Sequence, residues 1–358
     1  MDSVRHSSAA GDQAYGALDL GTNNCRLLVA RPSRRGFLVV DAFSRIIRLG
    51  EGVGATGRLS DVAMNRTLEA LRICSTKLQR TRVVRSRLVA TEACRVASNG
   101  PEFLDRVRLE TGLDIEILSR ESEARLAVSG CAALLDGHSD LALVFDIGGG
   151  SSELVWLDLS RRRTDRTRSM QERIDAQNCI AAWTSLPVGV VTLAERFGGR
   201  NVSRDDFDAM VDHVHTHLEP FEATHRFRDR MRNERSHLLG TSGTVTTVAG
   251  IHLGLKRYDR SRVDGCWMRT SDARAVTQSL IDRSYEERVA EPCIGRERAD
   301  LVLAGCAILE AIAETWPCET LRVADRGLRE GILASLMAED GVYRNQRRQT
   351  DDRGRRGA

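Results

Sequence analysis

Two stretches of the chain repeat one pattern, and this repeat restricts the fold more than any other feature. The stretch ALDLGTNNCRLLV begins at Ala17, and the stretch VFDIGGGSSELVW begins at Val144. In each, an apolar strand ends on an aspartate, an apolar residue and a glycine follow, and small polar residues lead into a returning apolar strand. This order is typical of a tight hairpin. Two copies, one near the start of each half, predict two related lobes.

The rest of the chain alternates strand-like and helical patterns, which favours an α/β fold. Strands of the first half are expected at 15–19, 26–30, 37–49, 88–91 and 115–118, and helices at 60–80, 101–110 and 121–135. In the second half, strands are expected at 141–145, 153–157 and 321–325, and helices at 190–197, 203–218, 244–255, 272–284, 299–316 and 327–337. The segment DGH at 136–138 has no periodicity and contains a turn dipeptide, so we place the lobe boundary there.

These boundaries define the expected domain organisation. We expect a disordered lead over residues 1–14, an N-terminal lobe over 15–137, a C-terminal lobe over 138–341 and a polar disordered tail over 342–358. The highly charged run at 161–175 has almost no apolar residues, and we interpret it as a solvated loop insertion.

Three consecutive glycines, Gly148, Gly149 and Gly150, end the first strand of the second repeat. Glycine weakens a strand, so its usual benefit is close approach of the backbone to another group. Consecutive N–H groups form a concave nest that binds an anion, commonly phosphate, and the Ser151 hydroxyl would add a donor. A plain glycine-rich hairpin is the alternative for one copy alone. Because two copies match, we expect two hairpins that face each other across a phosphate chain.

Two acids flank this glycine segment, Asp146 before it and Glu153 after it. Two negative charges beside a bound anion are compatible with binding only if a cation lies between them. Carboxylate oxygens are ligands that favour Mg²⁺. We therefore predict a Mg²⁺ cofactor at Asp146 and Glu153.

The sequence offers neither a serine nucleophile elbow nor a cysteine in a phosphatase-type loop, so water is the expected nucleophile. A carboxylate should orient that water. On a helix, Glu123 shares a small apolar face with Leu126, Ala127 and Gly130. From this spacing alone, stabilisation of the helix N-terminus is the favoured role for Glu123, and catalysis is the alternative. Arg95 follows a strand end, where a guanidinium can hold phosphate oxygens in a fork.

Several other sites are excluded or disfavoured. Neither lysine, Lys77 or Lys256, follows a glycine as in GxxxxGK, which excludes a Walker-type loop. Residues 52–57 match GxGxxG, but that fingerprint requires its third glycine at the start of a helix, and here the helix-capping signal comes after it. No acid ends a second strand about 20 residues on, where a ribose would need one. Both observations disfavour a dinucleotide site. His213 and His217 share a helix face, but no third zinc ligand is evident.

Charge and cysteine usage restrict the partners and the compartment. The net charge of +3 provides no global basic field for nucleic acid. No apolar run approaches the length that spans a membrane. The nine cysteines are scattered singly, as expected for small buried residues in a reducing cytoplasm. We predict a cytoplasmic protein that binds neither nucleic acid nor a membrane.

Further motifs follow in a specific order and spacing. After ALDLGTNN they are RLGEG from Arg48, ATEACRVASN from Ala90, SRESEARLA from Ser119, FDIGGGSSEL from Phe145, GTSGT from Gly240, RADLVLAG from Arg298 and ADRGLREGIL from Ala324. With these motifs, over about residues 15–338, the chain resembles the exopolyphosphatase / guanosine pentaphosphate phosphohydrolase family of the actin-like ATPase superfamily.

The resemblance implies two ribonuclease-H-like lobes with a cleft between them, and hydrolysis of a terminal phosphoanhydride with Mg²⁺. It places Glu123 at the position that activates water, and Asp146 and Glu153 at the acidic metal-associated positions. The phosphate-binding residues that it implies are Gly21, Thr22, Asn23, Arg95, Gly148, Gly149, Gly150 and Ser151.

The resemblance leaves the substrate open. Inorganic polyphosphate is the leading prediction and guanosine pentaphosphate the alternative. A non-hydrolysing actin-like nucleotide-binding regulator and a kinase are further alternatives, although no aspartate base of a kinase can be identified. The chain departs from the family at Asn24, Ser152 and Ala324, where serine, threonine and serine are common. Long members carry C-terminal helical domains that help to bind extended polyphosphate and form dimers, so processivity and a homodimer remain open.

Overall fold

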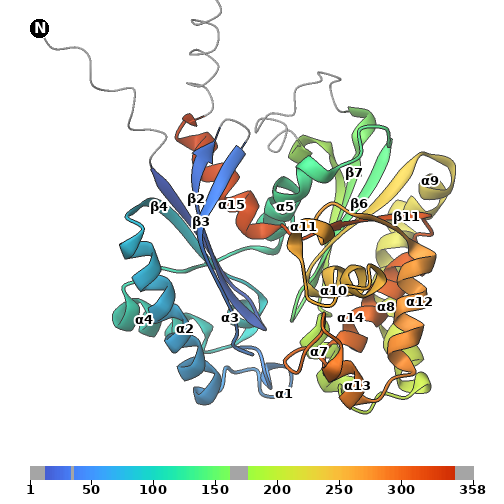
Figure 1. Cartoon of the computed structure of the whole chain (residues 1–358), viewed down its shortest axis with the longest axis horizontal. Helices are drawn as coiled ribbons and strands as arrows, with labels where there is room; N and C mark the ends of the chain where they lie inside the picture. The colour runs from blue at the N-terminus through green and yellow to red at the C-terminus, as the bar shows by residue number, and fades with distance from the viewer. Residues whose placement is uncertain (1–12, 34–35, 162–175, 343–358) are drawn as a thin grey trace, which may run out of the picture.

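The computed structural model describes residues 13–33, 36–161 and 176–342. Two sheets, each with helices on its faces, lie side by side (Figure 1). Most of the predicted lead, insertion and tail lies outside the described residues. The predicted α/β class with two lobes is confirmed.

The N-terminal sheet has the strand order β3-β2-β1-β4-β5. Its strands are β1 (Ala14–Leu20), β2 (Asn24–Ser33), β3 (Gly36–Ile46), β4 (Val83–Ala90) and β5 (Glu116–Ile117). The central strand β1 pairs with β2 as an antiparallel hairpin and with β4 in parallel. The turn between β1 and β2 therefore lies at the same edge of the sheet as the end of β4.

The C-terminal sheet repeats this topology and adds one strand, with the order β10-β11-β9-β6-β7-β8. Its strands are β6 (Leu141–Ile147), β7 (Ser152–Asp158), β8 (Ile180–Leu186), β9 (Ser236–Thr241), β10 (Trp267–Arg269) and β11 (Thr320–Ala324). The hairpin β6-β7 corresponds to β1-β2, and the parallel neighbour β9 corresponds to β4. The two lobes predicted from the repeated pattern are thus built on the same strand plan.

The helices of the first half are α1 (Val53–Thr56), α2 (Asp61–Arg80), α3 (Glu92–Val96), α4 (Gly100–Thr111) and α5 (Arg120–Cys131). Those of the second half are α7 (Val190–Phe197), α8 (Arg204–His225), α9 (Phe227–Asn233), α10 (Gly243–His252), α11 (Arg260–Val263), α12 (Thr270–Ile281), α13 (Tyr285–Ala290), α14 (Val302–Thr315) and α15 (Leu328–Glu339). Serine side chains cap the N-termini of α2 and α5. The hydroxyl of Ser60 accepts from the N–H of Ala63, and that of Ser119 accepts from the N–H of Ser122.

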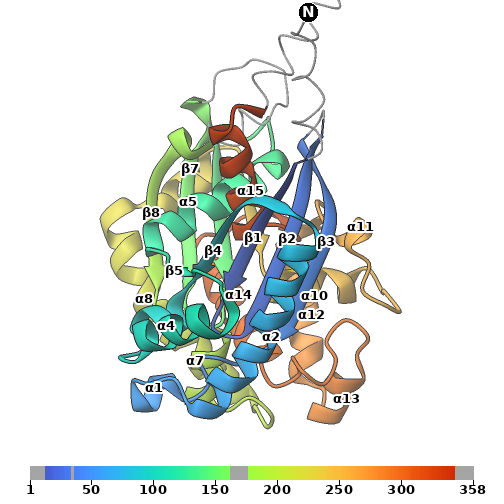
Figure 2. The same ribbon diagram turned by 90° about the vertical axis from the view of Figure 1, so that its left-hand side faces the viewer.

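The central strands β1, β6 and β7 are buried on both faces, since their successive residues point to opposite sides of the sheet and nearly all are buried. In β1, Leu18 and Leu20 pack with residues of α2 and α4, which cover the outer face in Figure 2. Tyr15 and Ala17 point to the other face and pack with residues of α15. This two-sided burial explains why the strands read as nearly continuous apolar runs rather than as alternating ones.

Helices α5 and α15 lie between the sheets, and each packs on the sheet of the other half of the chain. Helix α5 follows the N-terminal sheet in sequence, yet most of its buried apolar side chains pack on the C-terminal sheet. Helix α15 ends the described chain and packs on the N-terminal sheet. The helices touch through glycines, since a Cβ on Gly130 would lie 1.9 Å from the carbonyl oxygen of Gly327, and one on Gly331 would lie 2.0 Å from that of Leu126. The crossing therefore ties the lobes together.

Sequence patterns did not reveal every element. Strands β8, β9 and β10 and the short helix α3 were not expected, although β9 lies near the centre of the C-terminal sheet. The strand expected at 115–118 contracts to the two residues of β5, and the helix expected at 203–218 extends to His225 and includes Pro220. Short strands that follow charged segments carry too few residues for a clear period.

Candidate active site

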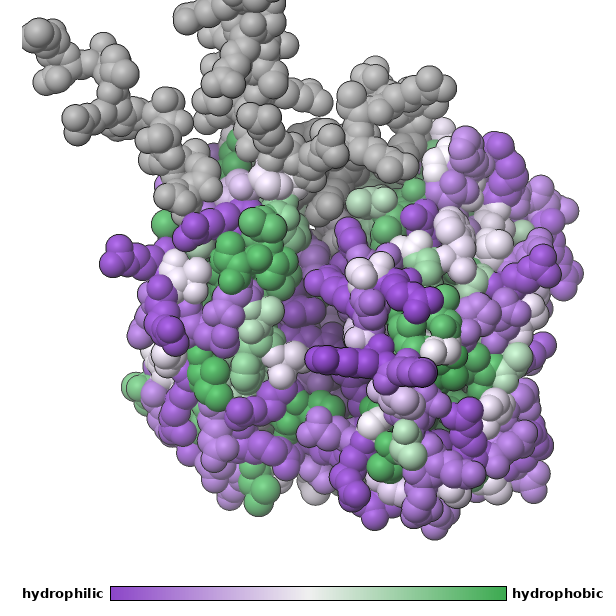
Figure 3. Space-filling view, in the orientation of Figure 1, coloured by the Kyte–Doolittle hydropathy of each residue, from purple (hydrophilic) through white to green (hydrophobic). Residues whose placement is uncertain are grey.

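The surface is hollowed between the lobes (Figure 3), and both repeated hairpins border this cleft. Its lining combines the two turns with acids and cations from both lobes. The predicted site residues that line it are Gly21, Thr22, Asn23, Glu123, Asp146, Gly148, Gly149, Gly150, Ser151 and Glu153. The structure thus brings together almost all of the predicted set from two distant parts of the sequence.

The first loop, residues 21–23, is fixed by the segment that follows β3. The carbonyl of Thr22 accepts a hydrogen bond from the N–H of Gly50 at 2.9 Å. The carbonyl of Asn23 accepts from the N–H groups of Ile47 and Arg48 at 2.8 and 3.0 Å. The side chains of Thr22 and Asn23 are buried. The RLGEG motif therefore holds the first loop in place through backbone hydrogen bonds.

The second loop, residues 148–151, rests on the start of α7. The N–H groups of Val190 and Val191 donate to the carbonyls of Gly148 and Gly149 at 2.9 and 2.8 Å. Within the described residues, the N–H groups of Gly149, Gly150 and Ser151 donate no hydrogen bond. A row of unused donors lies beside the cleft, as an anion-binding nest requires.

The glycines of the second loop allow it to touch the first loop. None of the three has a positive φ, so left-handed backbone is not the reason for glycine. A Cβ on Gly149 would lie 2.9 Å from Cβ of Thr22 and 3.1 Å from the nitrogen of Asn23. A Cβ on Gly150 would lie 2.8 Å from Oγ1 of Thr22. These positions therefore lack side chains because the other loop occupies the space.

The second hairpin carries two acids side by side. Asp146 and Glu153 are directly opposite in the β6-β7 register. Burial raises the pKa of Asp146 to about 6. Burial, and then the charge of Asp146, raise the pKa of Glu153 to about 7, although the Ser185 hydroxyl donates a hydrogen bond of 2.8 Å to its carboxylate. A cation between the two acids would relieve this repulsion.

Glu123 lies in the first turn of α5, and 13% of its side chain is exposed. Burial, and then the charge of Glu153, raise the pKa of Glu123 well above its usual value. Nη2 of Arg95 donates to Oε2 of Glu123 at 3.1 Å. Oε1 of Glu123 makes no hydrogen bond among the described residues, so one carboxylate oxygen is available in the cleft.

Arg95, predicted to contact phosphate, is directed to protein groups instead. Its Nε and Nη2 donate to Oε2 of Glu92 at 2.9 and 2.6 Å, and its Nη1 donates to the carbonyl of Leu118 at 2.5 Å. Arg95 is also absent from the residues that line the cleft, whereas Glu92 lines it. Its predicted contact with phosphate therefore stays a prediction.

Sequence reasoning missed several residues of the cleft. Asp19 and Arg26 are opposite one another in the β1-β2 register and line the cleft, and burial raises the pKa of Asp19. Glu92 and Arg298 also line it. All four belong to motifs that were recognised, and the correspondence of Asp19 with Asp146 in the repeat was the signal that could have identified the first of them.

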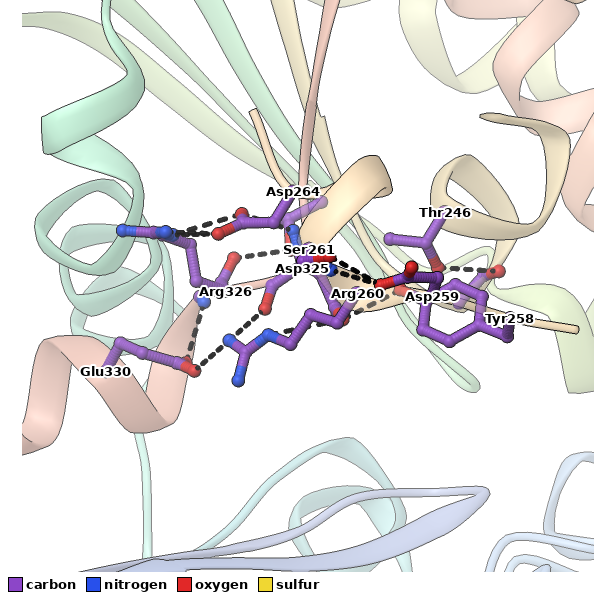
Figure 4. A network of polar contacts seen from close by, with 12 residues as sticks. Thr246, Tyr258, Asp259, Arg260, Ser261, Asp264, Asp325, Arg326 and Glu330 are labelled. Carbon is purple, nitrogen blue, oxygen red and sulfur yellow. Dashed lines mark hydrogen bonds and ion pairs between the residues drawn. The ribbon is translucent and has the colours of Figure 1, made fainter. Parts of the chain in front are cut away.

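The ADRGLREGIL motif is held by a network of ion pairs and hydrogen bonds (Figure 4). Tyr258 donates from its hydroxyl to Oδ2 of Asp325 at 2.7 Å, and the N–H of Asp325 donates to Oδ1 of Asp264 at 3.0 Å. Nη2 of Arg260 donates to Oε1 of the buried Glu330 at 3.2 Å. The network anchors the start of α15 to α11, and Asp325 serves in it as an acceptor and a donor.

No group of three or more His, Cys, Asp or Glu side chains in the described part of the chain could hold a metal ion by itself. Asp146 and Glu153 are only two acids.

None of the helices in the described ranges is long and apolar enough to span a membrane. The cytoplasmic location and the homodimer stay predictions.

Comparison with known proteins gives a consistent result. The model of the Ppx/GppA phosphatase family matches residues 28–340. A curated relative from Photobacterium profundum, named guanosine-5'-triphosphate,3'-diphosphate pyrophosphatase, is 28% identical over 326 residues. The alignment covers 91% of this chain and 59% of the relative, so the chain spans about three fifths of that protein's length.

Solved structures show the same architecture. The Ppx/GppA family member of Aquifex aeolicus is 26% identical with a TM-score of 0.69, and the match covers 92% of this chain and 98% of the other. An exopolyphosphatase-like protein is 27% identical with a TM-score of 0.77, covering 90% and 97%. An exopolyphosphatase from Cytophaga hutchinsonii ATCC 33406, 24% identical with a TM-score of 0.79 over 91% and 98%, shares the fold. Two ribonuclease-H-like lobes of the actin-like superfamily are thereby confirmed.

Proposed function

The chain belongs to the Ppx/GppA phosphatase family, whose members are phosphatases, and from this premise we propose that it releases terminal orthophosphate from inorganic polyphosphate. Water attacks the terminal phosphorus, the bridging P–O bond breaks, and the chain leaves one phosphate shorter. The proposal rests mainly on one observation: residues 149–151, whose N–H groups donate to no described residue, line one cleft together with Glu123 and the acids Asp146 and Glu153.

The two loops are the proposed binding site for the terminal phosphates. The unused N–H groups of Gly149, Gly150 and Ser151 can donate to phosphate oxygens without first breaking a protein hydrogen bond. The hydroxyl of Thr22 adds a donor from the opposite loop. Because donors come from both lobes, a bound phosphate would complete the polar contacts across the cleft.

The donor set fits Mg²⁺. Asp146 and Glu153 offer anionic oxygens, and the buried side-chain oxygens of Asn23 and Asn24 have no hydrogen-bond partner in the part of the chain that the structure describes. Proteins commonly bind Mg²⁺ through one or two carboxylates together with water and substrate phosphates, so a third protein acid is not required. When bound, the ion would neutralise the charge that develops on phosphate oxygens. Asp146 and Glu153 would hold it.

Glu123 is the proposed base. Its Oε2 accepts from Arg95, while Oε1, which accepts from no other described residue, can accept a hydrogen bond from water. A buried carboxylate with a raised pKa is a stronger base than an exposed one, which favours proton transfer from water during attack. Glu123 would therefore orient the water and take its proton.

The alternative substrate is guanosine pentaphosphate. The name of the Photobacterium profundum relative favours it. In favour of polyphosphate, no aromatic side chain among the described residues lines the cleft, so a guanine base would lack a stacking partner there. The same loops, acids and base would serve either reaction, because both break a terminal phosphoanhydride.

Phosphate release from the two substrates tests the proposal. Orthophosphate would be measured from polyphosphate and from guanosine pentaphosphate at equal phosphoanhydride concentration, with Mg²⁺. We expect faster release from polyphosphate. Faster release from guanosine pentaphosphate would support the alternative, and binding of either without release would support the non-hydrolysing regulator.

A further inference from the structure

Glu92 is a buried acid for which the proposed reaction assigns no role. It begins α3, it is 6% exposed and it lines the cleft. Oε2 accepts from Nε and Nη2 of Arg95 at 2.9 and 2.6 Å, and Oε1 accepts from Nη2 of Arg120 at 2.7 Å. One carboxylate therefore holds two guanidinium groups at the edge of the cleft.

Through Glu92, the orientation of Arg95 is determined before any substrate binds. The guanidinium plane is held on one side by Glu92 and at Nη1 by the carbonyl of Leu118. Only Nη2 reaches Glu123, at 3.1 Å, and it is shared with Glu92. Arg95 thus donates to Glu123 through one nitrogen, which it shares with Glu92, rather than through two parallel hydrogen bonds.

We propose that Glu92 is a positioning residue for hydrolysis, and this inference rests on the proposed function of the cleft. By holding Arg95 at a fixed angle, Glu92 prevents the guanidinium from engaging both oxygens of Glu123. A guanidinium binds a carboxylate most strongly through two parallel hydrogen bonds. Without Glu92, Arg95 would turn to make that pair with Glu123, and the oxygen that should accept from water would be occupied.

Glu92→Gln is the decisive variant, because glutamine keeps the stem that packs beside the second loop. A Cβ on Gly150 would lie 3.1 Å from Cγ of Glu92, so shortening the side chain would also disturb the loop. We expect kcat to fall at least about tenfold, on the scale of general-base effects, while KM changes less than about threefold. The matched control is Glu121→Gln, which removes the same charge from an exposed acid of α5 paired with Arg125 and should leave kcat unchanged.

A double-mutant cycle separates positioning from folding. If Glu92 acts through Arg95, then Glu92→Gln combined with Arg95→Lys should be no slower than Arg95→Lys alone. A merely structural role predicts a lower Tm with normal kcat per folded enzyme. Fold-changes that multiply in the double variant, or a kcat of Glu92→Gln within about twofold of wild type, would overturn the inference.

A readout without turnover distinguishes this inference from the proposed function. In protein with ¹⁵N-labelled arginine, the Nε–H of Arg95 should exchange slowly in the wild type, because Glu92 accepts it in a buried site. Arg95→Lys identifies the signal. Fast exchange in Glu92→Gln supports the positioning role, and unchanged exchange contradicts it. Absence of phosphate release from both substrates in the wild type would instead contradict the proposed function.

Discussion

The two hairpins share one strand plan, but their opposing residues carry different charges. In the first hairpin, Asp19 lies opposite Arg26, so the acid has a cation as its cross-strand neighbour. In the second, Asp146 lies opposite Glu153, so two acids are adjacent. The first hairpin therefore places an acid opposite a cation, whereas the second places two acids opposite each other, where the proposed Mg²⁺ ion would bind.

The loops of the two hairpins also differ, in a complementary way. The first loop fills the space between the lobes with the buried side chains of Thr22 and Asn23. The second loop has glycine where these side chains approach, and among the described residues the N–H groups of Gly149, Gly150 and Ser151 donate no hydrogen bond. The first loop therefore supplies side-chain bulk, while the second loop leaves room for that bulk and presents backbone N–H groups.

The largest expected effect comes from Glu123, which lies where the two halves meet. Glu123→Gln keeps the shape of the side chain but loses the charge that orients and deprotonates water. We expect turnover to fall by about 10²–10⁴-fold, while polyphosphate still binds. Phosphate release and equilibrium binding of polyphosphate measure the two effects. Retention of more than about a tenth of wild-type turnover would remove Glu123 from the role of base.

Gly149→Ala breaks the complementarity of the loops. The new methyl would lie 2.9 Å from Cβ of Thr22, so the loops must separate. Overpacking of this kind costs about 1–3 kcal/mol, which lowers Tm by only a few degrees in a protein of this size. We expect kcat/KM to fall by more than about tenfold, because several donors move away from phosphate together.

The control for this variant is Gly137→Ala, where a Cβ meets nothing within 4 Å. It should leave Tm and kinetics unchanged. If Gly149→Ala leaves both unchanged as well, phosphate does not bind at the second loop. Global unfolding of Gly149→Ala would instead assign the glycines to the hairpin itself.

Metal dependence sharpens the difference between the hairpins. Asp146→Asn and Glu153→Gln should each raise the Mg²⁺ concentration needed for half-maximal activity by at least about tenfold, because hard cations require anionic oxygens. Asp19→Asn should change this concentration less, since Asp19 already has Arg26 opposite it. A Mg²⁺ titration of each variant makes the comparison.

Removal of the metal gives the matching control. Excess EDTA should abolish activity in the wild type, and added Mg²⁺ should restore it. Full activity in EDTA would contradict a metal site. An equal shift of the titration in all three variants would show that the two hairpins do not differ in this respect.

The smallest expected effect concerns a contact between lobes at the cleft margin. Nη1 of Arg48 donates to Oδ2 of Asp300 at 2.8 Å, and the N–H of Gly52 donates to Oε1 of Glu195 at 2.8 Å. A partly exposed ion pair contributes about 0–1 kcal/mol, so Arg48→Ala should change kcat/KM by less than about fivefold. The change should shrink as ionic strength rises.

Charge reversal tests whether Arg48 acts through its ion pair with Asp300. Arg48→Glu should lower kcat/KM more than Arg48→Ala, and Arg48→Glu combined with Asp300→Arg should recover part of the loss. Kinetics at low and high salt measure both effects. No recovery in the double variant would mean that Arg48 acts through the first loop alone, since its N–H donates to the carbonyl of Asn23.

Much of the fold and the site could be predicted from the sequence, where the determining interactions are local. The repeated hairpins were recognisable because Asp, Gly and small polar residues recur at fixed spacing between apolar strands. The helix expected from residue 121 begins at Arg120, so Glu123 lies in its first turn as the sequence suggested. Strand β9 was missed because SHLLGT contains few β-branched residues and no clear alternation.

Contacts between distant segments were decided only by the tertiary structure. The amino-acid sequence determined two lobes, their hairpins and the acids beside the glycines, because each depends on neighbours in the chain. It could not show that α5 and α15 cross between the sheets or that Arg95 is held by Glu92 and Glu123. It also suggested phosphate as the reason for Gly149, whereas the folded chain shows Thr22 and Asn23 against that position. Packing across a cleft depends on where both lobes lie, and no local pattern carries that information.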